Sequence, residues 1–140
     1  MGIVAAVVAA ITAAAAVVDV RTRRIPNWLT FGTAAIGFTM AAAHIDSVGV
    51  IGALEGLTLG LLLMLPGYVI RKTGAGDVKL LAAVGTLLGP ESIAMAFLFS
   101  AIAGGGLALI ALVRRRDRDD HKFAYAPAIA IGTIVAAVWR

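Results

Sequence analysis

Two aspartates stand beside long apolar stretches of this chain and could do acid–base chemistry together. Asp19 follows the apolar run 2–18, and Asp77 closes a Gly-Ala-Gly-Asp segment (74–77) directly before another apolar run. An ionisable side chain at the edge of a hydrocarbon region is costly, so each acid requires a reason for its position. Two carboxylates that converge at one membrane face are the minimum equipment of an aspartyl hydrolase.

The composition indicates which elements must position these acids. The chain has 140 residues, of which 61% are hydrophobic and 14% are charged, and its mean hydropathy is +0.97. These values are typical of a membrane protein. The apolar runs are 2–18, 28–43, 50–70, 78–89, 92–113 and 123–139. We therefore expect an all-α polytopic protein of about six transmembrane helices, forming a single membrane-embedded domain over residues 1–140.

The basic residues provide an independent check on this topology. If every apolar run crosses, eleven of the 12 Lys and Arg residues fall on one side, which the positive-inside rule makes cytoplasmic. Only Arg140 falls outside, and both termini are then external. The run 78–89 is needed as a crossing, because without it the third basic cluster would change sides. The three clusters are Arg21, Arg23 and Arg24; Arg71, Lys72 and Lys79; and Arg114, Arg115, Arg116, Arg118 and Lys122.

Each aspartate also has a purely structural interpretation. Asp19 could be a counter-ion for the arginines that follow it, although a negative charge at a helix C-terminus opposes the helix dipole. Asp77 follows a glycine and precedes an apolar run, so it could be a helix N-cap. The joint context favours a site, since the expected topology brings both acids to the cytoplasmic ends of their spans.

The short fourth run adds an argument about depth. A helix from Asp77 to Gly89 rises only about 20 Å, against a hydrocarbon core of about 30 Å. We therefore expect Asp77 to lie below the cytoplasmic surface, with the glycine segment 74–76 dipping towards it. Such backbone must be shielded by protein or water, which predicts a small wet cavity. In that cavity one carboxylate could keep a proton and polarise a peptide carbonyl, while the other deprotonates a water.

Other polar or small residues have weaker claims to function. Gly52, Gly56 and Gly60 share one helix face, which favours close helix packing inside the monomer, with a homodimer contact as the alternative. Glu55, on the same span, could join a polar site, but the favoured interpretations are that it reaches the outer surface or hydrogen-bonds a neighbouring helix. His44 and Asp46 are too few ligands for a metal site.

The composition also limits the cofactors and partners. The chain has no cysteine, which excludes disulfides, thiol catalysis and thiolate metal sites. The net charge of +4 is explained by topology and anionic lipid headgroups, so no nucleic acid partner is expected. The two-aspartate chemistry requires neither a metal nor an organic cofactor.

Two segments resemble the motifs of a known family. Residues 19–30 (DVRTRRIPNWLT) look like the first aspartate motif of the type IV prepilin peptidases, and residues 74–85 (GAGDVKLLAAVG) look like their second, the GxGD motif. A lone GxGD is a weak signal, but both segments in a polytopic chain are a strong one. Besides Asp19 and Asp77, the motif positions singled out as support are Pro26, Asn27, Gly74, Gly76 and Lys79.

The resemblance implies an activity and a location. It implies an aspartic endopeptidase, with Asp19 and Asp77 catalytic, that removes the leader peptide of type IV prepilins at the cytoplasmic face of a prokaryotic inner membrane. The partners implied are the prepilin leader with its adjoining hydrophobic helix, and membrane lipids. Larger members carry a cysteine-rich methyltransferase portion, so we expect no N-methylation here. The compact form is similar to the peptidases of tight-adherence (Flp) pili and to archaeal preflagellin peptidases.

Two functions from other classes compete with the peptidase. A non-catalytic assembly subunit of a pilus or secretion apparatus would keep the fold without needing both acids, so the intact pair counts against it. A small transporter or proton-coupled channel would also use intramembrane acids, but near the middle of the membrane.

Lys79 has two open roles of equal weight: it either anchors the chain at the cytoplasmic face or acts on Asp77 as a nearby cation.

The topology can be tested with reporter fusions. Fusions after Arg24, Lys72 and Arg118 are expected to read cytoplasmic, and fusions after Asp46 and Arg140 to read external, because basic residues concentrate on the cytoplasmic side. An external signal at Arg118 would show that the run 78–89 does not cross. The last two spans would then be inverted, and the six-span architecture would be wrong.

Overall fold

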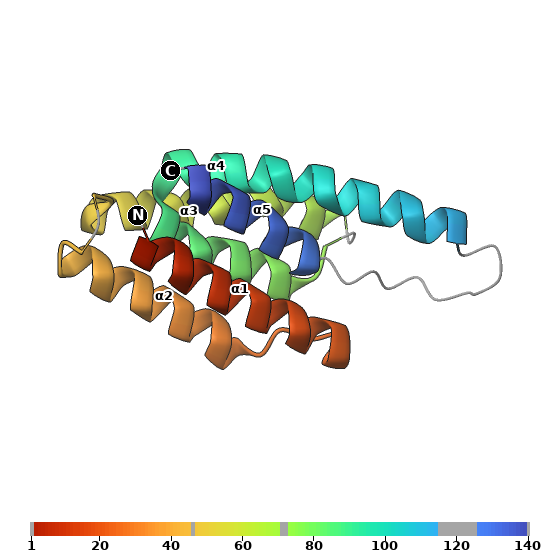
Figure 1. The fold of residues 1–140 in the computed structure, drawn as a ribbon, viewed down its shortest axis with the longest axis horizontal. Coiled ribbons are helices and arrows are strands. Elements are labelled where there is room, and N and C mark those ends of the chain that lie inside the picture. Colours follow the sequence, from red (N-terminus) through yellow and green to blue (C-terminus); the bar gives the residue numbers. More distant parts are fainter. Residues whose placement is uncertain (1, 46, 71–72, 115–125, 140) are drawn as a thin grey trace.

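The fold is helical throughout the part of the chain that the structure describes. A computed structural model describes residues 2–45, 47–70, 73–114 and 126–139, and contains no strand within these ranges. The helices are α1 (Gly2–Thr22), α2 (Asn27–Ala42), α3 (Gly49–Val69), α4 (Ala75–Arg114) and α5 (Ala126–Trp139). They lie side by side along one long axis (Figure 1). The predicted all-α class is confirmed.

The helices follow the apolar runs closely, because long runs without polar residues are stable as helices in a membrane. Three are long and apolar enough to span a membrane, namely Gly2–Thr22, Gly49–Val69 and Ala75–Leu107. A shorter apolar helix covers Pro127–Trp139, and α2 has 16 residues. The chain is thus built as an integral membrane protein. The number of six spans and the external termini stay predictions.

Helix α4 consists of two halves that are separated at Gly89. This glycine has φ 74° and ψ 178°, a conformation that residues with a Cβ rarely adopt. Pro90 follows and has no N–H to continue the helical hydrogen bonds. The chain reverses direction at this point, so the second half of α4 runs back along the first (Figure 1). The boundary between the apolar runs 78–89 and 92–113 is therefore a break in the helix, although it is tighter than a loop.

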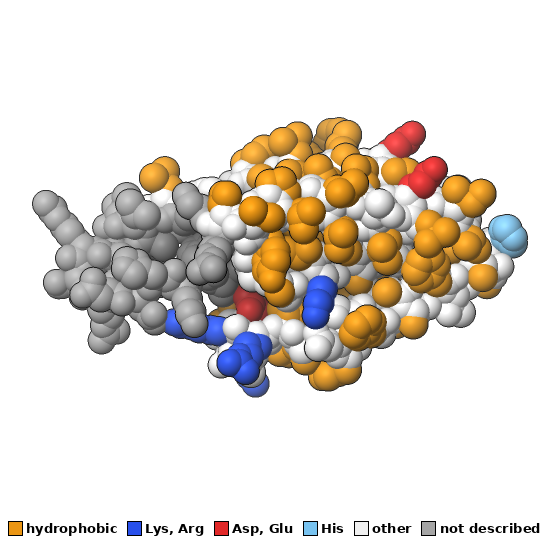
Figure 2. All heavy atoms as spheres, turned by 180° about the vertical axis from the view of Figure 1, so that it is seen from behind, with side chains coloured by type: hydrophobic (Ala, Val, Ile, Leu, Met, Phe, Trp, Pro, Cys, Tyr) orange, Lys and Arg blue, Asp and Glu red, His pale blue; other side chains and the backbone are white. Residues whose placement is uncertain are grey.

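The reversals define two ends of the bundle. The connection from α1 to α2 and the start of α4 lie at one end, which we call the aspartate end. The connection from α2 to α3 and the break at Gly89 lie at the other, which we call the far end; α1 begins and α5 ends there (Figure 1). The described Lys and Arg side chains lie towards the aspartate end (Figure 2). The remaining basic residues of the predicted clusters lie outside the described side chains.

The first half of α4 is the centre of the core. Every residue from Leu80 to Gly89 is buried, and the fully buried side chains include Leu80, Leu81, Val84 and Leu88. A helix that is apolar on all sides is buried either in a protein core or in a membrane. Here α4 packs against α3, α5 and α2. The central helix therefore carries Asp77 in its first turn while the rest of it is enclosed.

Glycines allow α3 to approach this central helix closely. A Cβ added to Gly60 would lie 2.8 Å from the carbonyl oxygen of Leu81, and one added to Gly56 would lie 3.0 Å from the Cα of Gly89. Both distances are too short for a real side chain, so the backbones touch. The predicted packing of Gly56 and Gly60 inside the monomer is confirmed, and α4 covers them against a second copy. Gly52 faces only Val48 of its own chain.

Gly85 provides a test of this close packing. A Cβ on Gly85 would meet the backbone of Gly56 and lie 3.1 Å from the amide nitrogen of Leu57. Gly85→Ala should therefore destabilise the fold by about 2 kcal/mol, measured as lower thermal stability in detergent. The matched control is Gly105→Ala on the second half of α4, where a Cβ has no neighbour within 4 Å. That variant should be neutral or slightly more stable, and equal losses in both would contradict the packing.

Candidate active site

Asp19 lies in the last turn of α1, as its position after the first apolar run predicts. Its side chain is only 7% exposed, and its carbonyl oxygen accepts a hydrogen bond from the N–H of Arg23 over 2.7 Å. Arg23 adopts a left-handed conformation with φ 52°, which ends the helix and turns the chain. A carboxylate here opposes the helix dipole. Local helix stability therefore does not explain Asp19.

Asp77 lies in the first turn of α4 and is 9% exposed. Its carboxylate accepts a hydrogen bond from the N–H of Gly74, and the carbonyl of Gly74 accepts one from Val78 over 3.4 Å. The N-cap interpretation is wrong, because the helix begins at Ala75 and Asp77 is already inside it. The side chain instead reaches back to the cap residue, as the acid of a capping box does. The dipole favours an anion at this position.

The two aspartates meet at the aspartate end of the bundle. Their carboxylates are close enough to interact electrostatically, and both side chains are buried. The convergence that the topology predicts is thus present between residues 58 positions apart in the sequence. Like charges in a buried place repel each other, so such a pair is stabilised when one member holds a proton. This arrangement can hold one ionised and one protonated acid side by side.

The supporting motif residues lie around this pair. Pro26 has φ −68° and stands directly before α2, where its fixed geometry suits a helix start. Gly76 faces Ile25, and a Cβ on Gly76 would lie 3.1 Å from the Cβ of Ile25. Lys79 donates a hydrogen bond through its Nζ to the Oδ1 of Asn27 over 3.2 Å. The segment between α1 and α2 therefore touches the first turns of α4 at two places.

Sequence reasoning missed the pairing of these motif residues. It singled out Asn27 and Lys79 separately, and it gave Ile25 no role. The available signal was weak: Asn27 opens a helix after a proline, and Ile25 is an apolar residue inside a basic segment. Neither feature identifies a partner on a helix about fifty residues away. The hydrogen bond and the contact with Gly76 become visible only in three dimensions.

Other candidate positions lie away from the aspartates. Glu55 is exposed on α3, in its half nearer the far end. Within the described ranges, no group of three His, Cys, Asp or Glu residues could hold a metal ion; Asp46, considered above beside His44, is outside those ranges. The predicted wet cavity around the aspartates stays a prediction.

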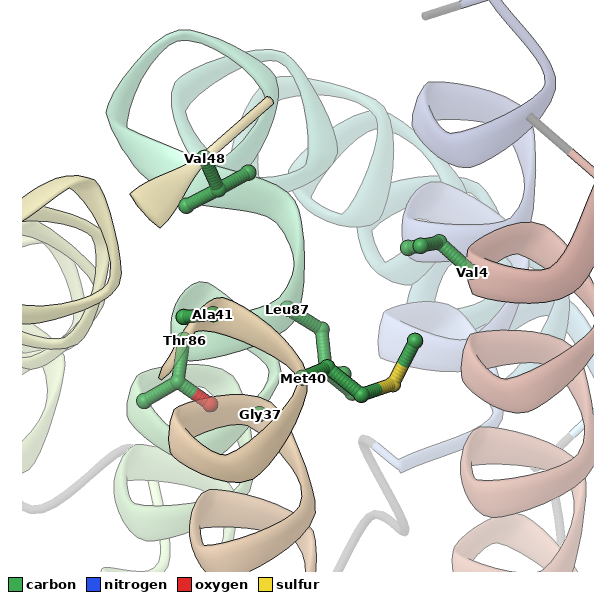
Figure 3. A pocket seen from close by; sticks show the side chains of 7 residues that line it. All are labelled: Val4, Gly37, Met40, Ala41, Val48, Thr86 and Leu87. Atoms are coloured by element: carbon green, nitrogen blue, oxygen red, sulfur yellow. The ribbon is translucent and has the colours of Figure 1, made fainter. Parts of the chain in front are cut away.

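The structure has a small cavity at the far end of the bundle (Figure 3). Its volume is about 10 Å³, roughly the space of one water molecule. Its lining is almost entirely apolar. The hydroxyl of Thr86 donates a hydrogen bond to the carbonyl oxygen of Ala83 over 2.7 Å. Because it lies at the opposite end from the aspartates, it is not part of the site. The lining residues are Val4, Gly37, Met40, Ala41, Val48, Thr86 and Leu87.

The comparison with known families agrees with this site. Residues 6–109 match the model of the type IV leader peptidase family. This range includes both aspartates, and it runs from the second turn of α1 into the second half of α4. A buried pair of aspartates in a helical membrane protein and a match over most of the chain point to the same class. The chain belongs to the type IV leader peptidase family.

Individual relatives give the same assignment. The chain is 32% identical over 127 residues to a prepilin leader peptidase/N-methyltransferase of Bacillus subtilis, covering 89% of this chain and 50% of that protein. It is 31% identical over 128 residues to a protein of the same name from Pectobacterium carotovorum, covering 87% and 46%. One from Burkholderia pseudomallei is 39% identical over 88 residues, covering 59% and 28%. No solved structure matches the chain.

These coverages limit what the relatives imply. The chain spans about half the length of the Bacillus and Pectobacterium proteins. Their names combine two activities, a peptidase and an N-methyltransferase. These names therefore describe the relatives as whole proteins.

Proposed function

We propose that this chain is an aspartic endopeptidase that cleaves the leader peptide of type IV prepilins, of the Flp-like kind, at the cytoplasmic face of a prokaryotic inner membrane. The observation that carries the proposal is the buried pair of Asp19 and Asp77, which interact electrostatically at one end of the bundle. Membership of the leader peptidase family supports the same reaction. Peptide cleavage is the activity proposed for this chain.

The proposed mechanism uses the two carboxyl groups in different protonation states. The ionised aspartate takes a proton from a water, whose oxygen attacks the scissile peptide carbon. The protonated aspartate donates a hydrogen bond to the carbonyl oxygen and stabilises the charge that develops on it. Collapse of the tetrahedral intermediate breaks the C–N bond. The proton that the first aspartate took from the water passes to the leaving amine. The residues need no cofactor for these steps.

The location of the pair suits a substrate that is itself partly embedded in the membrane. A prepilin has a leader peptide followed by a hydrophobic helix, which can lie beside the bundle in the lipid. The aspartates lie at an end of the helices, so they can meet a peptide bond at the edge of such a helix. The basic side chains Arg21, Arg23 and Arg24 are exposed at this end, which suits the cytoplasmic face.

Three other functions are less well supported. A non-catalytic assembly subunit would not need two acids buried against each other, because their repulsion and desolvation destabilise the fold. A preflagellin-type peptidase would use the same pair on a different substrate, and it is distinguished by the substrate alone. A transporter would place its acids near the middle of the bundle, whereas Asp19 and Asp77 lie in terminal turns of their helices.

The catalytic pair can be tested by substitution. Asp19→Asn and Asp77→Asn should each abolish cleavage of a co-expressed prepilin, scored by its mobility shift, while the protein stays in the membrane. Each acid is required, because one supplies the base and the other the proton. Glu55→Gln is the matched control, since Glu55 is an exposed acid away from the pair. Substantial cleavage by either well-expressed aspartate variant would remove that residue from the mechanism.

A further inference from the structure

The helices that carry the two aspartates have little direct contact with each other. Helix α1 packs mainly against α5, and it touches α4 only slightly. Asp19 is in the last turn of α1 and Asp77 is in the first turn of α4. Direct packing of α1 on α4 therefore does not set the spacing of the two carboxylates. Helix α5 packs on both α1 and α4, and the chain that joins α1 to α2 is the other element that can hold the end of α1 beside the start of α4.

The connection from α1 to α2 (residues 23–26) and the first residue of α2, Asn27, make the contacts with the start of α4 that α1 itself lacks. Ile25 lies against Gly76, one residue before Asp77. Asn27 accepts a hydrogen bond from the Nζ of Lys79, two residues after Asp77. One contact is apolar and the other is a hydrogen bond from a charged donor, which is stronger than a neutral one. Together they bracket Asp77 in the sequence.

The geometry of the hydrogen bond indicates that Asn27 and Lys79 act on each other. Asn27 is the first residue of α2, directly after the N-cap residue Pro26, and its side-chain oxygen accepts the hydrogen bond from Lys79. Lys79 is exposed, whereas Asp77 is buried. Residues two apart on a helix point about 200° apart, so Lys79 projects away from Asp77. The ammonium group of Lys79 therefore acts on the site through its hydrogen bond to Asn27.

We propose that Lys79 and Asn27 are positioning residues that hold Asp19 at its working distance from Asp77. The hydrogen bond fastens the start of α2 to α4, and the short segment 23–26 transmits that position to the end of α1. Neither residue touches the reacting atoms. This inference rests on the proposed peptidase function, and it gives Lys79 a third role, which differs from both anchoring and direct action on Asp77.

The experiment compares cleavage rates of purified variants in detergent or liposomes. Lys79→Met and Asn27→Ala should each lower kcat by about tenfold with little change in KM, because the catalytic acids are displaced while the substrate contacts remain. The double variant should be no slower than either single variant, since both changes remove the same bond. Lys79→Arg and Asn27→Asp keep a donor and an acceptor and should retain most of the activity.

Controls separate this inference from its alternatives. Arg21→Met removes an exposed cation from the same end and should cleave at the wild-type rate, with all rates expressed per folded protein. Asn27→Ala leaves the charge of Lys79 in place, so a loss of activity in this variant cannot come from loss of anchoring or of the cation beside Asp77. Normal cleavage by Asn27→Ala, or additive losses in the double variant, would overturn the positioning role. If the wild type itself fails to cleave, or Asp19→Asn cleaves, the proposed function fails instead.

Discussion

The structure depends on keeping two carboxyl groups together inside an apolar protein. Asp19 and Asp77 are both buried and interact electrostatically, so burial and mutual repulsion oppose the arrangement. Only Asp77 has a local compensation, from the helix dipole and the hydrogen bond of Gly74. The pair persists because packing elsewhere holds the helices together. The central half of α4 supplies most of that packing, since every residue from Leu80 to Gly89 is buried.

The fold divides this work between a rigid part and a short connecting part. Gly56, Gly60 and Gly85 bring α3 and α4 into backbone contact, which fixes the helix that carries Asp77. Asp19 arrives on α1, which is held mainly by α5. The segment between α1 and α2 then links the two acids. Its left-handed Arg23 ends α1, and its neighbour Ile25 reaches Gly76. A site for acid–base chemistry is thus built from the ends of helices.

Much of this could be predicted from sequence, because a membrane leaves few alternatives to helices. The apolar runs located the helices, and the boundary between the runs 78–89 and 92–113 located the break in α4. The two acids were recognisable because charge is rare in such a chain. The start of α4 was predicted less well: the segment 74–76 was expected to precede the helix, yet the helix begins at Ala75. The bond between Lys79 and Asn27 could not be predicted, since it joins distant residues that carry no pairing signal.

The most direct test of the central claim is the proximity of the two acids in the native membrane. The chain contains no cysteine, so the double variant Asp19→Cys/Asp77→Cys introduces the only two thiols. A short bifunctional thiol reagent should join them, and protease digestion between the two positions should then leave the fragments linked. The pair Asp19→Cys/Glu91→Cys, which places one thiol near the break at the far end, should remain unlinked. Failure to link positions 19 and 77, or equal linking in the control, would contradict the account.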